Sequence, residues 1–409
     1  MPTIALKLTP LDVLFFRDSR PFGQADSAAT GLPTPQTFHG LVKTHLARAF
    51  GLPFDQIHGL RRSQSPNRWI SNIETRGVWL YKDGGIYVRT PSNIVQLGKV
   101  STSFRVLRPV HPDIDFPGWD KSDIRPLWYN EEAQGQSARS ASGFMSQTAL
   151  TDYLQNEDKE WHAADFTRDE ELFSFENRVG IGVDPNTRLA ADGQIYMASF
   201  LRLKPQVSFY GEISAEDSFD QLEQAFNQPQ VLPWGGEGRQ VLVERCNPID
   251  WPRPPAREPG ARLFSVLITP GIFGSRDARG QNGHGQNALP SWRPAGHGNL
   301  RAAAVGKPIP ISGWSLSGYS METEDAGDAT PANRYDPGEL SQRIQSGRPK
   351  PTRYAAAPGS VYFWQIGANN RSARNGKELR AIEPMCNKPI ESAVGWGMSL
   401  TGSWSWFTP

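Results

Sequence analysis

The chain opens with TIALKLTPLDVLFF (residues 3–16) and, after a loop, continues with TPQTFHGLVKTHLARAFG (residues 34–51). Apolar and polar residues alternate at the start of the first stretch, which predicts a half-buried strand. The second stretch starts with Thr34 and Pro35, typical of a helix cap and a first helical residue, and its apolar residues keep helical spacing up to Gly51. The fold therefore begins with a strand, a loop and a helix.

The segments that follow extend this unit into a β-α-β-β-α-β order. VWLYKDGGIYVRTP (78–91) predicts a hairpin around Asp83-Gly84, and residues 178–213 predict two further strands. SFDQLEQAFNQ (218–228) predicts a short amphipathic helix, and RQVLVERC (239–246) predicts a strand. This succession is the split βαβ, or ferredoxin-like, plan.

The length of 409 residues predicts two domains, each able to bury a core of its own. The first spans residues 1–246, with an insertion at about 111–170 that is rich in Pro, Gly and Trp. A Pro-rich joint at 247–260 precedes a second domain, 261–409, with long Gly-rich loops. A second, looser β-α-β-β-α-β unit fits that domain. We therefore expect an α+β protein made of two ferredoxin-like (RRM-like) domains with long loop insertions.

The composition of the chain excludes several classes of protein. The net charge is +1, whereas a free-standing, non-specific nucleic-acid binder is usually far more basic, so a polyanion would have to bind a local basic strip. Cys246 and Cys386 cannot build a disulfide framework, which suits a reducing cytoplasm. The start lacks the features of a signal peptide, and no apolar run reaches the roughly 18 residues that span a bilayer. We expect a soluble, cytoplasmic protein without membrane contact.

Two candidate anion sites lie in the first β-loop-α unit. Arg17 and Arg20 follow the apolar strand end in LDVLFFRDSRPF (11–22), where two guanidinium groups could fork phosphates; the alternative is a surface ion pair on a turn. His39 and Lys43 lie in the first turns of the helix, whose N-terminus favours anions, unless they are a solvated polar face. His45 lies on the apolar stripe, which indicates a core histidine.

Three further stretches combine glycine or proline with basic residues. Pro233–Arg239, with Gly235, Gly236, Gly238 and Arg239, would bring backbone N–H groups close to a polyanion, or is a tight turn. Arg178 lies on a hairpin that could project from the sheet. GRPKPTR (347–353), with Lys350 and Arg353, suits a phosphate backbone, or is a disordered linker.

The sequence shows no catalytic motif. It has no P-loop, no GxSxG, no HExxH and no evident carboxylate pair, and its seven histidines and two cysteines show no paired metal spacing. We therefore predict no enzyme activity, no cofactor and no metal.

Six segments, in this order, together resemble the third-numbered subunit of the Cmr (type III-B) CRISPR effector, a member of the RAMP superfamily. They are LDVLFFRDSRPF, TPQTFHGLVKTHL, RVGIGVDPNTRLAADGQIY, WGGEGRQV, GRPKPTRYAAAPGSVYF and GWGMSLTG. The resemblance covers most of the chain and implies two packed ferredoxin-like domains. It also implies a non-catalytic subunit that holds the 5′ handle of the guide RNA (crRNA). Its neighbours would be the large polymerase-type subunit and the backbone RAMP subunit.

The resemblance and the basic motifs together predict one set of RNA contacts, because an unpaired handle exposes its phosphates and bases. These residues are Arg17, Arg20, His39, Lys43, Arg178, Gly235, Gly236, Gly238, Arg239, Lys350 and Arg353. Two alternatives remain. One is a metal-independent endoribonuclease that processes precursor crRNA, with general base and acid supplied by His39 and a nearby Lys or Tyr. The other is a structural bridge whose basic strips meet acidic protein surfaces.

Overall fold

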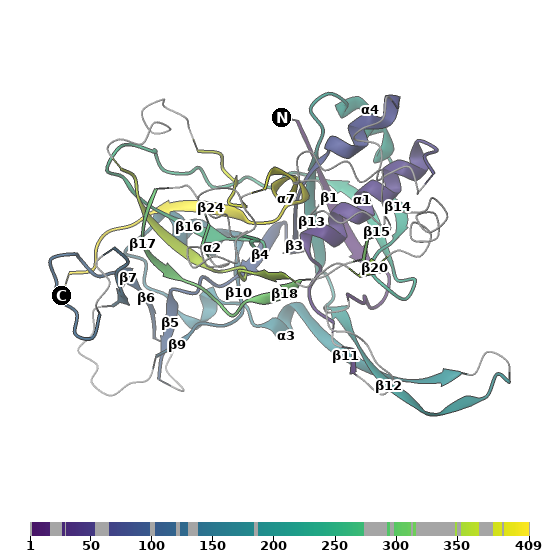
Figure 1. Cartoon of the computed structure of the whole chain (residues 1–409), viewed down its shortest axis with the longest axis horizontal. Coiled ribbons are helices and arrows are strands. Elements are labelled where there is room, and N and C mark those ends of the chain that lie inside the picture. Colours follow the sequence, from purple (N-terminus) through teal and green to yellow (C-terminus); the bar gives the residue numbers. More distant parts are fainter. Residues whose placement is uncertain are drawn as a thin grey trace, which may run out of the picture.

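A computed structural model gives the architecture of the chain (Figure 1). It describes residues 2–16, 27–28, 30–53, 65–98, 103–119, 123–129, 138–183, 187–273, 293–294, 298–311, 314–315, 348–349, 353–367, 379–386 and 388–408.

A seven-stranded antiparallel sheet forms the first half of the molecule, in the order β10-β4-β3-β13-β1-β15-β14. Along the chain its strands are β1 (Thr3–Pro10), β3 (Glu74–Lys82), β4 (Gly85–Arg89), β10 (Phe144–Ser146), β13 (Ser208–Ser214), β14 (Gln230–Pro233) and β15 (Gln240–Cys246). Helices α1 (Pro35–Ala49) and α4 (Phe219–Ala225) pack through Phe38, Val42 and Leu222 into the core cluster that contains Ile4, Leu6 and Leu8 of β1. The predicted strand, helix and 83–84 hairpin are thus confirmed.

A five-stranded sheet forms the second half, in the order β17-β22-β16-β24-β23. Its strands are β16 (Arg262–Leu267), β17 (Asn299–Ala304), β22 (Val361–Gln365), β23 (Glu383–Pro384) and β24 (Met398–Ser403), with α7 (Pro389–Val394) between the last two. The two sheets share one order: β15-β1-β13-β3 in the first matches β24-β16-β22-β17 in the second. A mixed α/β protein with few helices is confirmed, and the ferredoxin-like identity of the two domains stays a prediction.

The two sheets bury a joint core. One apolar cluster contains Trp79 and Tyr210 from the first sheet and Phe264 and Phe363 from the second. The indole Nε1 of Trp79 donates a hydrogen bond of 2.8 Å to the carbonyl of Ile268. The sheets are therefore packed face to face, with α1 and α4 on the outer side of the first one.

The predicted joint at 247–260 lies against the first sheet. The backbone N–H of Ile249 donates to the Tyr210 hydroxyl at 3.1 Å, and Trp251 Nε1 donates to Glu212 Oε1 at 2.7 Å. Glu212 is 3% exposed and also accepts a hydrogen bond from Tyr210 at 2.8 Å. A buried carboxylate thus anchors the segment between the two sheets.

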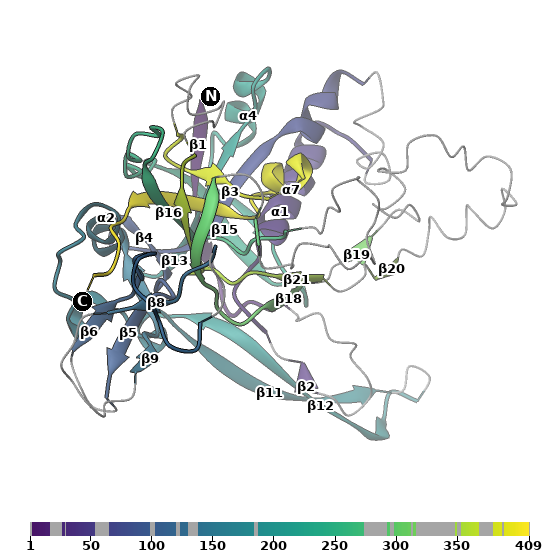
Figure 2. The same cartoon turned by 60° about the vertical axis from the view of Figure 1, so that its left-hand side comes forward.

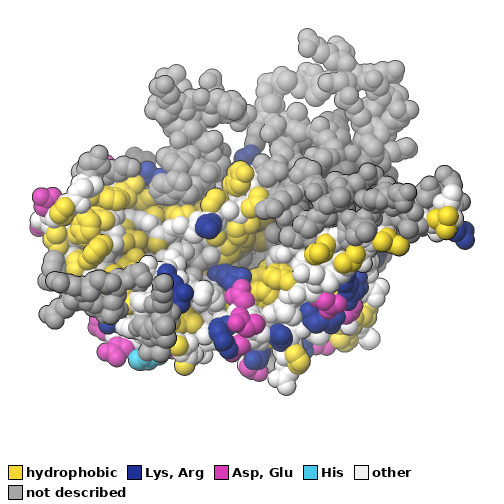
Figure 3. All heavy atoms as spheres, turned by 90° about the horizontal axis from the view of Figure 1, so that it is seen from below, with side chains coloured by type: hydrophobic (Ala, Val, Ile, Leu, Met, Phe, Trp, Pro, Cys, Tyr) yellow, Lys and Arg dark blue, Asp and Glu magenta, His cyan; other side chains and the backbone are white. Residues whose placement is uncertain are grey.

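A long hairpin leaves the body of the molecule as an arm, formed by β11 (Phe173–Val183) and β12 (Ala190–Leu203) (Figures 1 and 2). The short strand β2 (Ser27–Ala28) adds to β12 in parallel. Exposed apolar side chains are spaced along the arm, among them Phe175, Val179 and Met197 (Figure 3). The hairpin predicted around Arg178 does project from the body.

The predicted insertion at 111–170 is only partly peripheral, because it supplies edge strand β10 and helix α2 (Gln147–Gln155), which lies beside β4 and β24. The remaining elements are short. They are β5 (Ile94–Leu97), β6 (Phe104–Val106), β7 (Arg108–Pro109), β8 (Leu127–Trp128), β9 (Ala138–Ser140), α3 (Asp169–Leu172), β18 (Ile309–Ile311), β19 (Trp314–Ser315), β20 (Arg348–Pro349), β21 (Arg353–Ala355) and the 3-10 turns Pro66–Asn72 and Ala163–Asp165. Within the described ranges, no helix is both long and apolar enough to cross a membrane.

Candidate nucleic-acid interface

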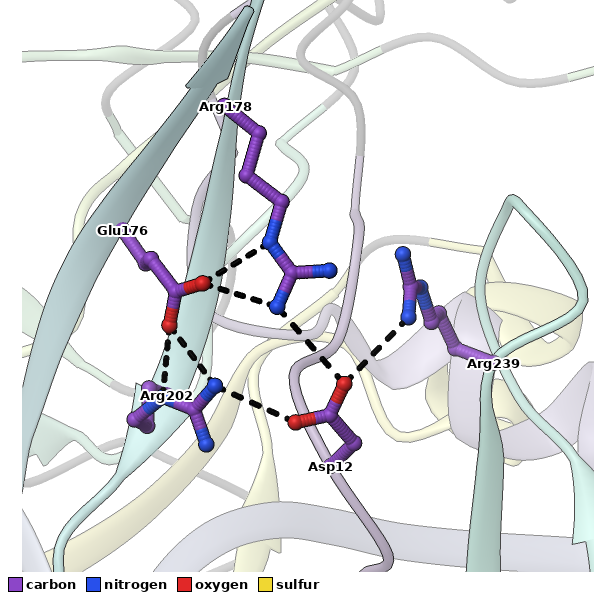
Figure 4. Close-up of polar contacts among 5 residues, drawn as sticks. All are labelled: Asp12, Glu176, Arg178, Arg202 and Arg239. Carbon is purple, nitrogen blue, oxygen red and sulfur yellow. Dashed lines mark hydrogen bonds and ion pairs between the residues drawn. The ribbon is translucent and has the colours of Figure 1, made fainter.

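Two of the predicted contacts, Arg178 and Arg239, meet at the base of the arm. Arg178 lies on β11, and Arg239 directly precedes β15. Arg202, from β12, joins them, and the carboxylates of Asp12 and Glu176 lie between the three guanidinium groups (Figure 4). We call these five residues the arginine cluster.

Backbone hydrogen bonds place Asp12 at the centre of the arginine cluster. Leu14 and Leu201 exchange N–H···O bonds of 2.8 Å, which join the segment after β1 to the arm. The N–H of Gly236 donates to the carbonyl of Phe15 at 2.8 Å, which joins the same segment to the 233–239 turn. Three parts of the chain that are distant in sequence are therefore held side by side.

Each carboxylate bridges several arginines. Glu176 Oε1 lies 2.7 Å from Arg178 Nη2, and Glu176 Oε2 lies 2.7 Å from Arg202 Nη2. Asp12 lies 3.1 Å from Arg202, 3.4 Å from Arg239 and 3.7 Å from Arg178. The hydrogen bonds from Arg202 and then Arg178 hold the pKa of Glu176 below its ordinary value. Both carboxylates orient the guanidinium forks.

The arginine cluster keeps the capacity to bind an anion. Three guanidinium groups face two carboxylates, which leaves one net positive charge, and each guanidinium has five N–H donors. The Arg178 and Arg202 side chains are 38% and 43% exposed. Charge-assisted, forked hydrogen bonds of this kind suit phosphate oxygens.

An aromatic ring underlies two of the arginines. The guanidinium carbons of Arg178 and Arg239 lie 5.1 Å and 4.8 Å from the centroid of Phe200. Phe200 packs against Phe15, with ring centroids 5.2 Å apart, in a small buried cluster. The ring restrains both side chains through cation–π attraction.

The predicted glycine turn has a different role from the one expected. Gly235 has φ +84°, and a Cβ built there would lie 2.6 Å from the Phe15 carbonyl oxygen. The N–H of Gly236 is already engaged by that carbonyl. Gly238 has φ +63° and open space around it. At Gly235 and Gly236 the close approach is therefore to the chain itself, and Gly238 alone of the three leaves room beside its backbone.

The structure places His39 in the core. Its side chain is 9% exposed, and Nδ1 lies 3.0 Å from Thr75 Oγ1. Burial, and secondarily the nearby Lys43, hold the pKa of His39 well below its ordinary value. His39 therefore has no open face for an RNA group. His45 is a core histidine as predicted, with Nε2 2.8 Å from the Ala225 carbonyl.

The other predicted contacts are elsewhere. Lys43 lies on α1, partly buried. Arg353 lies on β21, and its guanidinium is 2.6 Å from Glu391 Oε1, a carboxylate of α7 that is 4% exposed. Arg17, Arg20 and Lys350 lie outside the described residues. The structure thus brings two of the predicted cations together, Arg178 and Arg239.

Sequence reasoning missed Asp12, Glu176 and Arg202. A signal was present in the two-residue spacing of Glu176 and Arg178, which puts both on one face of a strand. Arg202 pairs across to Ser174 on the partner strand, so its side chain points to that same face. Among the described residues, no group of three or more His, Cys, Asp and Glu side chains is arranged to hold a metal ion.

Comparison with known proteins gives a family. Residues 6–330, more than half of the chain, match the family described as CRISPR-associated protein (Cas_Cmr3). No curated protein matches the sequence.

Several solved structures are remotely similar. A chain of the type III-B Cmr-beta complex bound to cognate target RNA and AMPPnP is 15% identical, with a TM-score of 0.45, and the match covers 88% of this chain and 86% of that one. A chain of the Csm3-Csm4 subcomplex of the type III-A interference complex is 13% identical, with a TM-score of 0.39 and coverage of 88% and 92%. A chain of a Csm1-Csm4 cassette with pppApA is 12% identical, with a TM-score of 0.34 and coverage of 90% and 88%.

Proposed function

This chain belongs to the Cas_Cmr3 family of CRISPR-associated proteins and is a Cmr3-like subunit of a type III effector complex, and we propose that within it the arginine cluster binds the 5′ handle of the crRNA. The observation that carries the proposal is the convergence of Arg178, Arg202 and Arg239 around Asp12 and Phe200. The role is binding without catalysis.

Electrostatics support an unpaired strand as the ligand. Such a strand exposes its phosphates continuously, so side chains from different elements can neutralise neighbouring phosphates. The arginines of the cluster come from two strands of the arm and from the turn before β15. Arginines on separate elements suit contacts with successive phosphates of one RNA strand. The net charge of the whole chain is only +1, so the positive charge that attracts the strand must be local.

The neighbourhood of the arginine cluster supports two further predicted contacts. Phe16, the residue before Arg17, packs its ring 4.9 Å from that of Trp234, next to the glycine turn. Arg17 and Arg20 therefore follow in sequence from a point beside the arginine cluster, and we keep them in the proposed set. Lys43, Gly238, Lys350 and Arg353 remain secondary candidates, and His39, Gly235 and Gly236 are left out.

The partners we propose are those that the sequence resemblance implies. They are the large polymerase-type subunit and the backbone RAMP subunit, with this chain between them at the handle.

The rival endoribonuclease role would need His39 as an accessible base, and its ring is buried against Thr75. Site-specific cleavage of repeat RNA by the pure protein in EDTA would contradict the non-catalytic role.

The test is a pair of substitutions in the arginine cluster. We expect Arg178→Ala with Arg202→Ala to weaken binding of a single-stranded handle RNA by roughly 10-fold per arginine, because each charge-assisted contact contributes about 1.5 kcal/mol or more. The slope of log affinity against log salt should also become shallower by about one per lost phosphate contact. Fluorescence anisotropy over a range of salt concentrations measures both.

The control is Arg245→Ala. Arg245 has a similar exposure, lies away from the arginine cluster, and pairs with Glu223 at a distance of 2.9 Å. It should leave both affinity and salt slope unchanged. Equal effects of the cluster and control substitutions would show a non-specific charge effect and refute the proposal.

A further inference from the structure

A second surface lies at the other end of the molecule from the arm, on the loop that joins β7 to β8 (Figure 1). Trp119 and Trp128 are 40% and 47% exposed. Among the tryptophans whose side chains the structure describes, these two alone are so exposed, and the nine others are buried or partly buried. Phe116 and Tyr129 flank them. We call these four residues the aromatic patch.

The aromatic patch is held in place by its own loop. Trp119 Nε1 donates to the carbonyl of Ile124 at 2.6 Å. The ring of Trp128 packs edge-to-face on Phe116, with centroids 5.2 Å apart, and stacks on Tyr129. The rings are therefore presented in ordered positions, so little side-chain entropy would be lost when a partner covers them. Large, preordered aromatic side chains of this kind dominate binding energy at protein interfaces.

In the described part of the β7–β8 loop the exposed charges are acidic, and Arg108 of β7, which lies opposite Trp128, is paired with Glu157 and Asp158. Asp113, Asp115 and Asp123 on the same loop are exposed. The one arginine of the described loop, Arg125, is turned inward, where its guanidinium donates to the carbonyls of Val110, His111 and Ile114. Acidic charge beside the rings repels a phosphate backbone, although aromatic rings alone would suit nucleobases.

We propose that the aromatic patch is a docking surface for another protein subunit of the same effector complex, one that presents basic side chains around an apolar groove. The inference rests on the proposed function only in that it needs the chain to work inside an assembly. Figure 3 shows a broad apolar area at this same end of the molecule. The patch would join the chain to its neighbour at one end while the arginine cluster holds RNA at the other.

The probe is the set of remaining subunits of the chain's own effector complex, purified together without this chain. We expect Trp119→Ala with Trp128→Ala to weaken association of the full chain with that assembly at least 10-fold, measured by biolayer interferometry. A milder variant, Asp113→Lys with Asp115→Lys, changes exposed charges without removing the rings. It should slow association and reduce the dependence of the on-rate on salt, because complementary charge steers encounter.

Handle-RNA affinity separates this inference from the proposed function. Both patch variants should bind handle RNA like the wild type, whereas the arginine-cluster variant should lose RNA and keep its affinity for the assembly. Unchanged association of both patch variants would overturn the inference. So would a loss of RNA affinity on removing the tryptophans, or a homodimer in sedimentation that those substitutions abolish.

Discussion

At the scale of the residue, the arginine cluster depends on side chains that the surrounding backbone aims. Asp12 is the residue that each arginine shares, and it reaches them because the segment after β1 is hydrogen bonded to both the arm and the glycine turn. In the proposed interface, Gly235 and Gly236 would act on RNA only indirectly. They let the backbone pass close to Phe15, and this contact positions Arg239.

Gly235 offers the sharpest test of that positioning. Gly235→Ala would place a Cβ 2.6 Å from the Phe15 carbonyl oxygen at a positive φ, so we expect it to cost about 2–4 kcal/mol of stability and to weaken RNA binding. Gly238→Ala meets no atom within 4 Å and should cost about 1 kcal/mol. Urea unfolding of both variants measures the difference, and equal losses would contradict the close-approach role.

His39 makes stability depend on pH. Its folded-state pKa is depressed by burial, so the unfolded chain takes up a proton near pH 6.5 while the folded chain does not. The free energy of unfolding is thus highest, as far as this histidine is concerned, above about pH 6.5. It falls as the pH drops below that value, by up to about 1.4 kcal/mol per pH unit. His39→Gln should flatten this decline in urea-unfolding measurements. The exposed His162→Gln is the control, and a wild-type slope in His39→Gln would disprove the assignment.

At the scale of the element, the β11–β12 arm has two different faces. Glu176, Arg178 and Arg202 point to one face, and Phe175 and Val179 point to the other, because side chains alternate along a strand. At the base of the arm this second face also meets the body, because Phe173 and Leu201 are buried in the core of the first sheet. The arm is therefore held to the body by ion pairs on one face and by apolar packing on the other. If the arginine cluster binds RNA as proposed, Asp12 and Glu176 would compete with phosphate for the guanidinium groups and lower the RNA affinity.

Asp12→Asn tests that competition. Removing one negative charge beside three arginines should tighten RNA binding at low salt by roughly 5-fold, which corresponds to about 1 kcal/mol of Coulomb energy in a high-dielectric setting. Hydrogen exchange in the arm should rise at the same time, because the arm loses one of its links to the body, the ion pairs of Asp12 with Arg178 and Arg202. Glu244→Gln, which breaks the Lys7 pair elsewhere on the sheet, is the matched control. Weaker RNA binding by Asp12→Asn would count against the competition.

At the scale of the whole molecule, the two sheets behave as one unit. They share the core around Trp79 and Phe264, and the segment between them is pinned by the buried carboxylate of Glu212. Each half also buries residues of its own, in one cluster within residues 4–243 and another within residues 267–385, so separate cores exist beside the shared one. The arginine cluster and the aromatic patch lie at opposite ends of this unit, which separates the two proposed contacts in space.

Glu212→Ala should destabilise the whole chain. It leaves the indole N–H of Trp251 and the nearby Arg76 without their acceptor, which costs about 3 kcal/mol. Because the core is shared, circular dichroism and tryptophan fluorescence should still report one coincident unfolding transition. Glu244→Ala, at a partly exposed ion pair, should change stability by less than about 0.5 kcal/mol. Two separate transitions in the wild type would refute the joint unit.

The amino-acid sequence alone was enough for the local features of this protein. Residue periodicity and capping located the first strand, α1, α4 and the 83–84 hairpin, and the order of short motifs indicated the family, because these signals depend on neighbouring residues. Tertiary structure alone decided that Asp12, Glu176 and Arg202 join Arg178 and Arg239, that His39 is buried, and that the two sheets share a core. Contacts between residues so distant along the chain are set by strand order and packing. Neither can be predicted from residues that are neighbours in the sequence.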